Sequence, residues 1–271
     1  MAHSPTWLRC IGLWAGVGLA LAGSAAPAVL TTGDIAIVGV SACPGVNDDQ
    51  VSFFCFKIIT TGTTIDLTDN GYERCITGQF GNTEGTVRMT RTGADIPAGT
   101  VITFSMTNTT LITATSPDAA WSCVQMNFAG SLIELNNGGD QLIFMQGGAW
   151  SMGAVNTHNA TYSGRYLAAV STNSAFPWTA SCATNPTQRS NPPPGVGCLA
   201  LRVTSATAWD KYTGPITAAT QKDWLLRLVN TGNWTPYGSC AAYSAAAPNW
   251  LAPPPVVMPI LPPTMVVNGL W

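Results

Sequence analysis

Short apolar runs, separated by turns that contain glycine, asparagine or proline, recur through residues 29–240. The runs are rich in β-branched and aromatic residues, which favour strands. They follow one another at intervals of about ten residues, as in sandwiches and barrels. We expect strands over residues 35–40, 51–59, 64–67, 85–90, 101–106, 132–135, 141–145, 166–170 and 199–203. The sequence therefore predicts one all-β domain spanning residues 29–245.

One bulge and one helix are expected within this pattern. Gly39 interrupts the first apolar run, and a glycine inside a strand often marks a β-bulge. Residues 217–229 carry apolar side chains at helical spacing, namely Ala218, Trp224, Leu225, Leu228 and Val229. We expect this helix to pack across one end of the sandwich.

The N-terminus has the pattern of a secretory signal peptide, assigned to residues 1–28. A weakly basic start precedes an apolar stretch over residues 10–21, and small residues follow it. The apolar stretch is shorter than the roughly 20 residues that span a bilayer. We expect cleavage between Ala22 and Ala28, and we expect no transmembrane segment later in the chain. The mature protein is therefore predicted to be secreted or held at the cell surface.

Charge is scarce: Asp, Glu, Lys and Arg make up 9% of the residues, and the formal net charge is −2. Typical soluble domains have about 25% charged residues. Nucleic-acid binding depends on clustered positive charge, so this composition excludes nucleic acid as an expected partner.

Seven cysteines remain after the signal peptide and its Cys10 are removed. They have no C-x-x-C spacing and no neighbouring histidine, which argues against a zinc or redox site. In an oxidising compartment they are expected to form disulfides, with one left over. Because short loops close most easily, Cys43 is expected to pair with Cys55 or Cys75, and Cys182 with Cys198. The full set is Cys43, Cys55, Cys75, Cys123, Cys182, Cys198 and Cys240.

Residues 246–271 differ from the domain before them because they are rich in proline. Proline at this spacing forbids a helix and favours an extended chain, so we expect a disordered tail. A removable lipid-anchor signal is the alternative, because small residues precede an apolar end.

Several motifs resemble a module of secreted bacterial proteins, similar in its order of parts to the lamin-tail domain. They are Gly33-Asp34-Ile35-Ala36, Thr68-Asp69-Asn70-Gly71, Thr83-Glu84-Gly85-Thr86, Pro97-Ala98-Gly99-Thr100 and Gly139-Asp140-Gln141-Leu142. The resemblance implies an immunoglobulin-like β-sandwich on a secreted or cell-surface protein, in some cases attached to extracellular nucleases or adhesins. It implies no fixed chemistry. Tyr72 stands where the module has tryptophan.

Catalytic machinery is not expected. His158 is the only histidine after the signal peptide, and a hydrolase triad needs a base beside a nucleophile and an acid. Neither a G-x-S-x-G nor a phosphate-binding G-x-x-x-x-G-K-[ST] motif occurs. We therefore interpret His158 as a loop residue and expect no enzyme activity.

Acidic residues around the Asp-Asn-Gly turn form a candidate calcium site. The proposed ligands are Asp66, Asp69, Asn70, Glu73 and Glu84. Calcium prefers carboxylate, amide and carbonyl oxygens, although the spacing is not that of an EF-hand. The alternative is that Asp69 and Asn70 bond to the backbone of their own turn.

Tryptophans provide a candidate sugar site, because aromatic faces stack on sugar rings. Trp150 and Trp178 lie at loop positions and are the candidates for stacking. The alternative is that they belong to the core, as most tryptophans in sandwiches do.

Together these features predict a secreted, non-catalytic β-sandwich with a structural or adhesive role at the cell surface or in the matrix. Extracellular polysaccharide or surface proteins are its expected partners, and no cofactor is expected, with calcium as the alternative. The alternatives are a carbohydrate- or calcium-binding module, and an accessory domain or fragment of a secreted hydrolase or nuclease.

Overall fold

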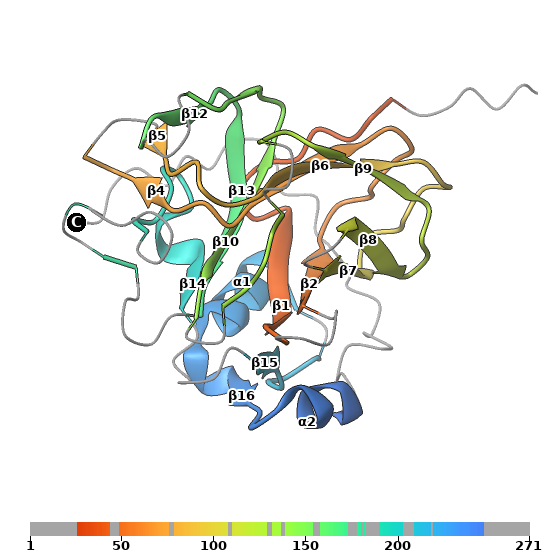
Figure 1. The fold of residues 1–271 in the computed structure, drawn as a ribbon. Coiled ribbons are helices and arrows are strands. Elements are labelled where there is room, and N and C mark those ends of the chain that lie inside the picture. Colours follow the sequence, from red (N-terminus) through yellow and green to blue (C-terminus); the bar gives the residue numbers. More distant parts are fainter. Residues whose placement is uncertain are drawn as a thin grey trace, which may run out of the picture.

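The chain folds into a mainly β structure built on two six-stranded sheets (Figure 1). It is known from a computed structural model. The structure describes residues 26–43, 49–75, 79–107, 110–128, 132–136, 139–153, 158–172, 178–179, 182, 190–202, 209–217 and 219–246.

The first sheet is antiparallel throughout, with strand order β16-β15-β1-β2-β7-β8. Its strands are β1 (Ile35–Ser41), β2 (Asp49–Cys55), β7 (Val101–Thr107), β8 (Thr110–Ser116), β15 (Trp209–Tyr212) and β16 (Trp234–Pro236). The predicted bulge is confirmed, because the register of β1 against β2 shifts between Ile37 and Gly39.

The second sheet has the order β14-β13-β10-β3-β6-β9, and only its β13–β14 pair is parallel. Its strands are β3 (Thr64–Thr68), β6 (Thr86–Arg91), β9 (Trp121–Gln125), β10 (Gln141–Gln146), β13 (Arg165–Ser171) and β14 (Ala200–Arg202). A third, small sheet consists of β11 (Trp150–Ser151), β12 (Ala160–Tyr162), β5 (Gln79–Phe80) and β4 (Tyr72–Glu73).

The main core lies between the two large sheets. Phe53 of β2 meets Phe104 of β7 at 5.2 Å between ring centroids, and Phe144 of β10 at 5.1 Å. These rings come from both sheets, so the sheets pack face to face through them. A second core of Tyr72, Phe80, Ile143, Met145, Tyr162 and others lies under the small sheet.

The predicted helix is confirmed but is shorter, as α1 (Gln221–Val229). It begins at Gln221 because the Thr220 hydroxyl accepts a hydrogen bond from the Asp223 amide and caps the first turn. Trp224 stacks on Phe54 at 5.7 Å, which holds the helix against the first sheet. A second helix, α2 (Cys240–Ala245), was not predicted.

Three sequence-based strands need correction. The strand expected over 51–59 ends at Cys55 and is found as Asp49–Cys55. Residues 132–135 form no strand, because acidic side chains bind the backbone amides of residues 134–136. The strand expected over 199–203 is divided: Gly197–Leu199 form a turn of 3₁₀ helix, and only Ala200–Arg202 are extended.

Two disulfides join distant parts of the chain, Cys43 to Cys240 and Cys75 to Cys182. The short-loop pairings were therefore wrong. Closure entropy rises only slowly with loop length, so separations of 197 and 107 residues cost little more than short ones. Cys55 and Cys123 are free, and the side chain of Cys198 lies outside the described residues.

The described residues contain no helix that is both long and apolar enough to cross a membrane. The predicted tail falls in 246–271, of which only Ala246 is described.

Candidate functional site: the acidic end of the sandwich

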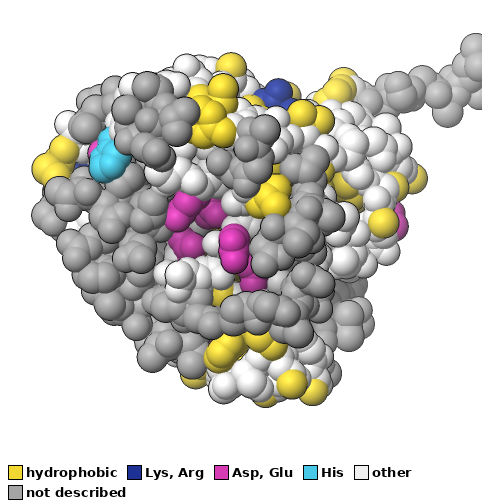
Figure 2. All heavy atoms as spheres, viewed as in Figure 1, with side chains coloured by type: hydrophobic (Ala, Val, Ile, Leu, Met, Phe, Trp, Pro, Cys, Tyr) yellow, Lys and Arg dark blue, Asp and Glu magenta, His cyan; other side chains and the backbone are white. Residues whose placement is uncertain are grey.

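Four acidic residues meet at one end of the sandwich, where strands of both large sheets begin or end. Asp49 opens β2, Asp69 follows β3, Glu84 precedes β6 and Asp140 precedes β10. Figure 2 shows acidic side chains gathered in the middle of one face of the molecule. We call these four residues the acidic end.

A short stretch of backbone runs across the acidic end and is held by three carboxylates. The Glu134 amide donates to Asp69 Oδ2 at 3.0 Å, and the Leu135 amide donates to Asp49 Oδ2 at 2.8 Å. The next amide, of Asn136, donates to Asp140 Oδ2 at 3.3 Å. Three successive amides are thus bound by side chains, which explains why the apolar residues 132–135 join no sheet.

The side-chain amides of Gln141 and Asn70 join the segments that carry these acids. Gln141 Nε2 donates to both the Asp69 carbonyl and Asp140 Oδ1 and so joins the two acids. Asn70 Oδ1 accepts from the Glu84 amide at 3.1 Å, and its Nδ2 donates to the Gly85 carbonyl at 3.1 Å. Asn70 therefore ties the end of β3 to the segment before β6, rather than bonding only within its own turn.

Burial makes these carboxyl groups difficult to ionise. Asp69 is 1% exposed, and burial raises its pKa to about 8 against the opposing hydrogen bond from the Glu134 amide. Burial also raises the pKa of Glu84, and the charges of Asp69 and Asp140 raise it further. The pKa of Asp140 is raised by burial first and by Asp69 next. The three groups are close enough to oppose one another's ionisation.

No positive charge compensates them among the described residues. The ion pairs found there are Lys57–Asp34, Arg88–Asp66, Arg91–Asp118 and His158–Glu73, and none includes Asp69, Glu84 or Asp140.

Some carboxylate oxygens of the acidic end already accept hydrogen bonds, and others do not. Both oxygens of Asp49 accept backbone amides, from Cys43 and Leu135. By contrast, Asp69 Oδ1 and Glu84 Oε2 are buried and accept no hydrogen bond of standard geometry within the described structure, although the Asp69 and Gly85 amides lie near enough to the Asp69 carboxyl to lower its pKa. No three acidic, histidine or cysteine side chains of the described residues form a ready-made metal site. The acidic end thus has two unused buried acceptors, not a complete coordination shell.

The structure brings together three of the five predicted calcium ligands, Asp69, Asn70 and Glu84. Asp66 lies apart from them, because Arg88 binds it through two hydrogen bonds of 2.6 and 2.7 Å and the Tyr162 hydroxyl donates to it at 2.7 Å.

Glu73 lies beside His158 instead, with Nδ1 2.7 Å from Oε1. Burial raises the pKa of Glu73, and the nearby His158 opposes that shift. His158 itself is about half exposed, with 43% of its side chain accessible.

Sequence reasoning missed Asp49 and Asp140 as members of this site. Asp140 was attributed to turn chemistry because it follows a glycine. The signal for its role is the register, in which Ile143 pairs with Thr68 and so brings Asp140 beside the residues that follow β3.

The two candidate sugar-stacking tryptophans are both half-buried. Trp150 packs on Phe80 with ring centroids 5.2 Å apart. Trp178 packs against the second core, and its Nε1 donates to the Leu201 carbonyl at 2.9 Å. Sugar stacking by these residues stays a prediction.

Fold and site define a mainly β, disulfide-linked protein with a buried acidic end. Comparison with protein-family models, with curated proteins and with solved structures finds no match to this chain.

Proposed function

We propose that this chain is a secreted, non-catalytic β-sandwich module, with a structural or adhesive role, whose acidic end binds a divalent cation. Calcium is the cation we propose. The observation that carries the proposal is the pair of buried, unused oxygens, Asp69 Oδ1 and Glu84 Oε2, in a group of acids with no positive partner.

Electrostatics supports this proposal. A buried carboxylate is costly unless it is paired, protonated or bound to a metal. Asp69, Glu84 and Asp140 have no Lys, Arg or His partner in the described structure, and protons or a metal ion would offset their charge near neutral pH. A divalent cation would neutralise two carboxylates at once, without protonating either.

The chemistry of the free atoms favours calcium over softer metals. Calcium takes six to eight oxygen ligands and tolerates irregular geometry, including waters and carbonyls. We propose Asp69 and Glu84 as the ligands, with Asp140 contributing charge, because both Asp140 oxygens already accept hydrogen bonds.

The position of the acidic end fits a structural role. Its proposed ligands follow β3 and precede β6, which are neighbours in the second sheet, so a bound ion would join the ends of these two strands. The two disulfides are consistent with an extracellular protein. We also propose that the sandwich is immunoglobulin-like and similar to the lamin-tail domain.

The test is thermal unfolding of the mature protein with calcium chloride and with a chelator. A ligand that binds only the folded state must raise the midpoint as its concentration rises. We expect calcium to raise the midpoint of the wild type and to have a much smaller effect on D69N, which keeps the side-chain shape and removes the charge.

The matched control is D95N, because Asp95 is an exposed acid far from the acidic end that accepts a bond from the Thr61 amide. Calcium should stabilise D95N as it stabilises the wild type. An unchanged wild-type midpoint at millimolar calcium, or equal shifts in wild type and D69N, would refute this site.

A further inference from the structure

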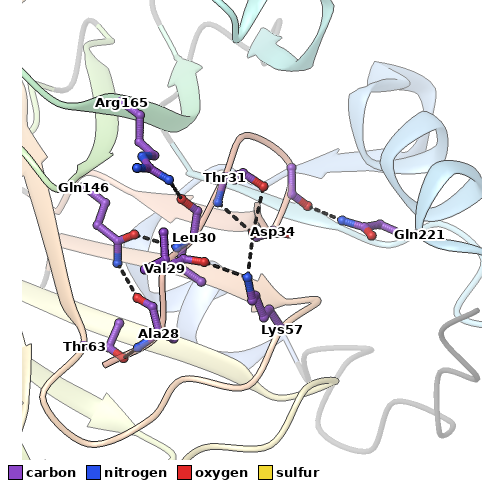
Figure 3. A network of polar contacts seen from close by, with 11 residues as sticks. Ala28, Val29, Leu30, Thr31, Asp34, Lys57, Thr63, Gln146, Arg165 and Gln221 are labelled. Carbon is purple, nitrogen blue, oxygen red and sulfur yellow. Dashed lines mark hydrogen bonds and ion pairs between the residues drawn. The ribbon is translucent and has the colours of Figure 1, made fainter. Parts of the chain in front are cut away.

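The first described residues are built into the body of the protein. Residues 26–32, which we call the N-terminal strap, precede β1 and cross between strands of the second sheet and the loop after β2 (Figure 3). The Leu30 side chain is fully buried in the main core. The strap is therefore part of the fold rather than a leader attached to it.

Side chains of the body hold the strap by its backbone. Gln146 clamps it, since Nε2 donates to the Ala28 carbonyl at 3.0 Å and Oε1 accepts from the Leu30 amide at 2.6 Å. Lys57 Nζ donates to the Val29 carbonyl at 2.6 Å, and Arg165 donates to the Leu30 carbonyl at 3.1 Å (Figure 3).

The contacts extend to the first residues of the strap. The Thr60 hydroxyl donates to the Ala26 carbonyl at 2.7 Å, and Thr63 Oγ1 accepts from the Ala28 amide at 2.8 Å. Pro27 lies directly over Gly62, where an added Cβ would be 3.2 Å from its Cγ. Thr60 and Thr63 are buried, so loss of residues 26–28 would leave buried polar groups without these partners.

The sequence around the strap allows several signal-peptide cleavage sites. Cleavage needs small residues one and three positions before the bond. Five bonds in the predicted range meet this rule, those that follow Ala22, Ser24, Ala25, Ala26 and Ala28. Sequence alone does not choose among them.

We propose that the precursor is cut on the N-terminal side of Ala26, after Ala22, Ser24 or Ala25, and that the mature protein keeps the whole strap at its N-terminus. This inference rests on the proposed secretion. Hydrolysis consumes one water, leaving a carboxylate on the signal peptide and an ammonium group on the mature chain. A cut after Ala26 would separate the Thr60-bound carbonyl from the chain. A cut after Ala28 would remove three strap residues and place an ammonium group on Val29, whose carbonyl already binds the Lys57 cation.

The first test is to express the full chain in a host with a secretory pathway and to determine the N-terminus of the exported protein by sequencing and intact mass. We expect it to begin at Gly23, Ala25 or Ala26. A start at Pro27, Val29 or later, or an exported chain that retains Met1, would overturn the proposal.

The second test does not depend on secretion and compares mature chains released from a cleavable tag. A chain that starts at Val29 should unfold roughly 5 °C or more below one that starts at Ala26. Because the shorter chain could fail to fold, T63V in the longer chain provides a milder variant, with T92V at an exposed position as its control. T63V should lower the midpoint and T92V should not. Equal midpoints for the two chains, or for T63V and T92V, would contradict the strap's role.

Discussion

Stability of the calcium-free protein should fall as pH rises from 5 to 7, and the D69N variant should reduce that fall. The folded-state pKa of Asp69 is about 8, above its ordinary value of 3.8. Between these values the folded state holds one more proton at Asp69 than the unfolded state does. Stability from this group is therefore fully present below pH 4 and is lost as pH rises toward 8.

The slope gives the magnitude. One proton corresponds to about 1.4 kcal/mol per pH unit, so Asp69 alone should lower the free energy of unfolding by about 3 kcal/mol between pH 5 and pH 7. Glu84 and Asp140 have raised pKa values as well and should steepen the fall. The pKa of Asp118 is lowered to about 2 by Arg91, so its effect falls below this pH range.

The assay is urea unfolding at pH 5, 6 and 7 in the presence of a chelator, for wild type, D69N and the D95N control. D69N should be less pH-dependent than the wild type by about 1.4 kcal/mol per pH unit. Calcium should flatten the wild-type profile, because it binds the ionised form. A wild-type stability that is constant or rises over this range, or identical slopes for wild type and D69N, would refute the reasoning.

Three further variants test the covalent and polar contacts. The C43S/C240S double variant should lose about 2–5 kcal/mol of unfolding free energy in guanidinium chloride, and no loss would mean that the disulfide does not form. R88M leaves the buried Asp66 carboxylate without its cation and should cost about 3–5 kcal/mol by urea unfolding, whereas a change within error would show that the pair is dispensable. Q146L leaves backbone groups of the strap unsatisfied and should cost about 1–3 kcal/mol, with faster hydrogen exchange at the Leu30 amide as the local signature.

Strands that are marked by their own apolar pattern could be predicted from the sequence. The run over 35–40 is apolar on both faces because β1 packs against the second sheet and against α1, and it is found as Ile35–Ser41 with every residue buried. The glycine at its centre correctly indicated the bulge. By contrast, residues 132–135 have the composition of a strand, but their amides are bound by acids that lie far away in the sequence. Only tertiary structure decides that competition.

The candidate site was predictable in part. Asp69, Asn70 and Glu84 were singled out together, and the structure places them together. Asp66 was included because it lies three residues from Asp69, yet the two differ in their partners, since Asp66 faces Arg88 and Tyr162. Asp140 follows a glycine and so has the pattern of a turn residue, and only the pairing of β10 with β3 makes it a neighbour of Asp69.

The acidic end and the strap use polar side chains in the same way, to bind backbone that no strand pairs with. A carboxylate oxygen that already accepts a backbone amide has less capacity to bind an ion, and this chain has few carboxylates. Asp49 has both oxygens occupied by amides, so it can hold the 134–136 segment but has no oxygen left unpaired for an ion. Asp69 binds an amide through Oδ2 and keeps Oδ1 free. A cation at Oδ1 would therefore hold in place the same carboxylate that binds the Glu134 amide. Removing the cation should increase the mobility of residues 134–136 before it affects either sheet.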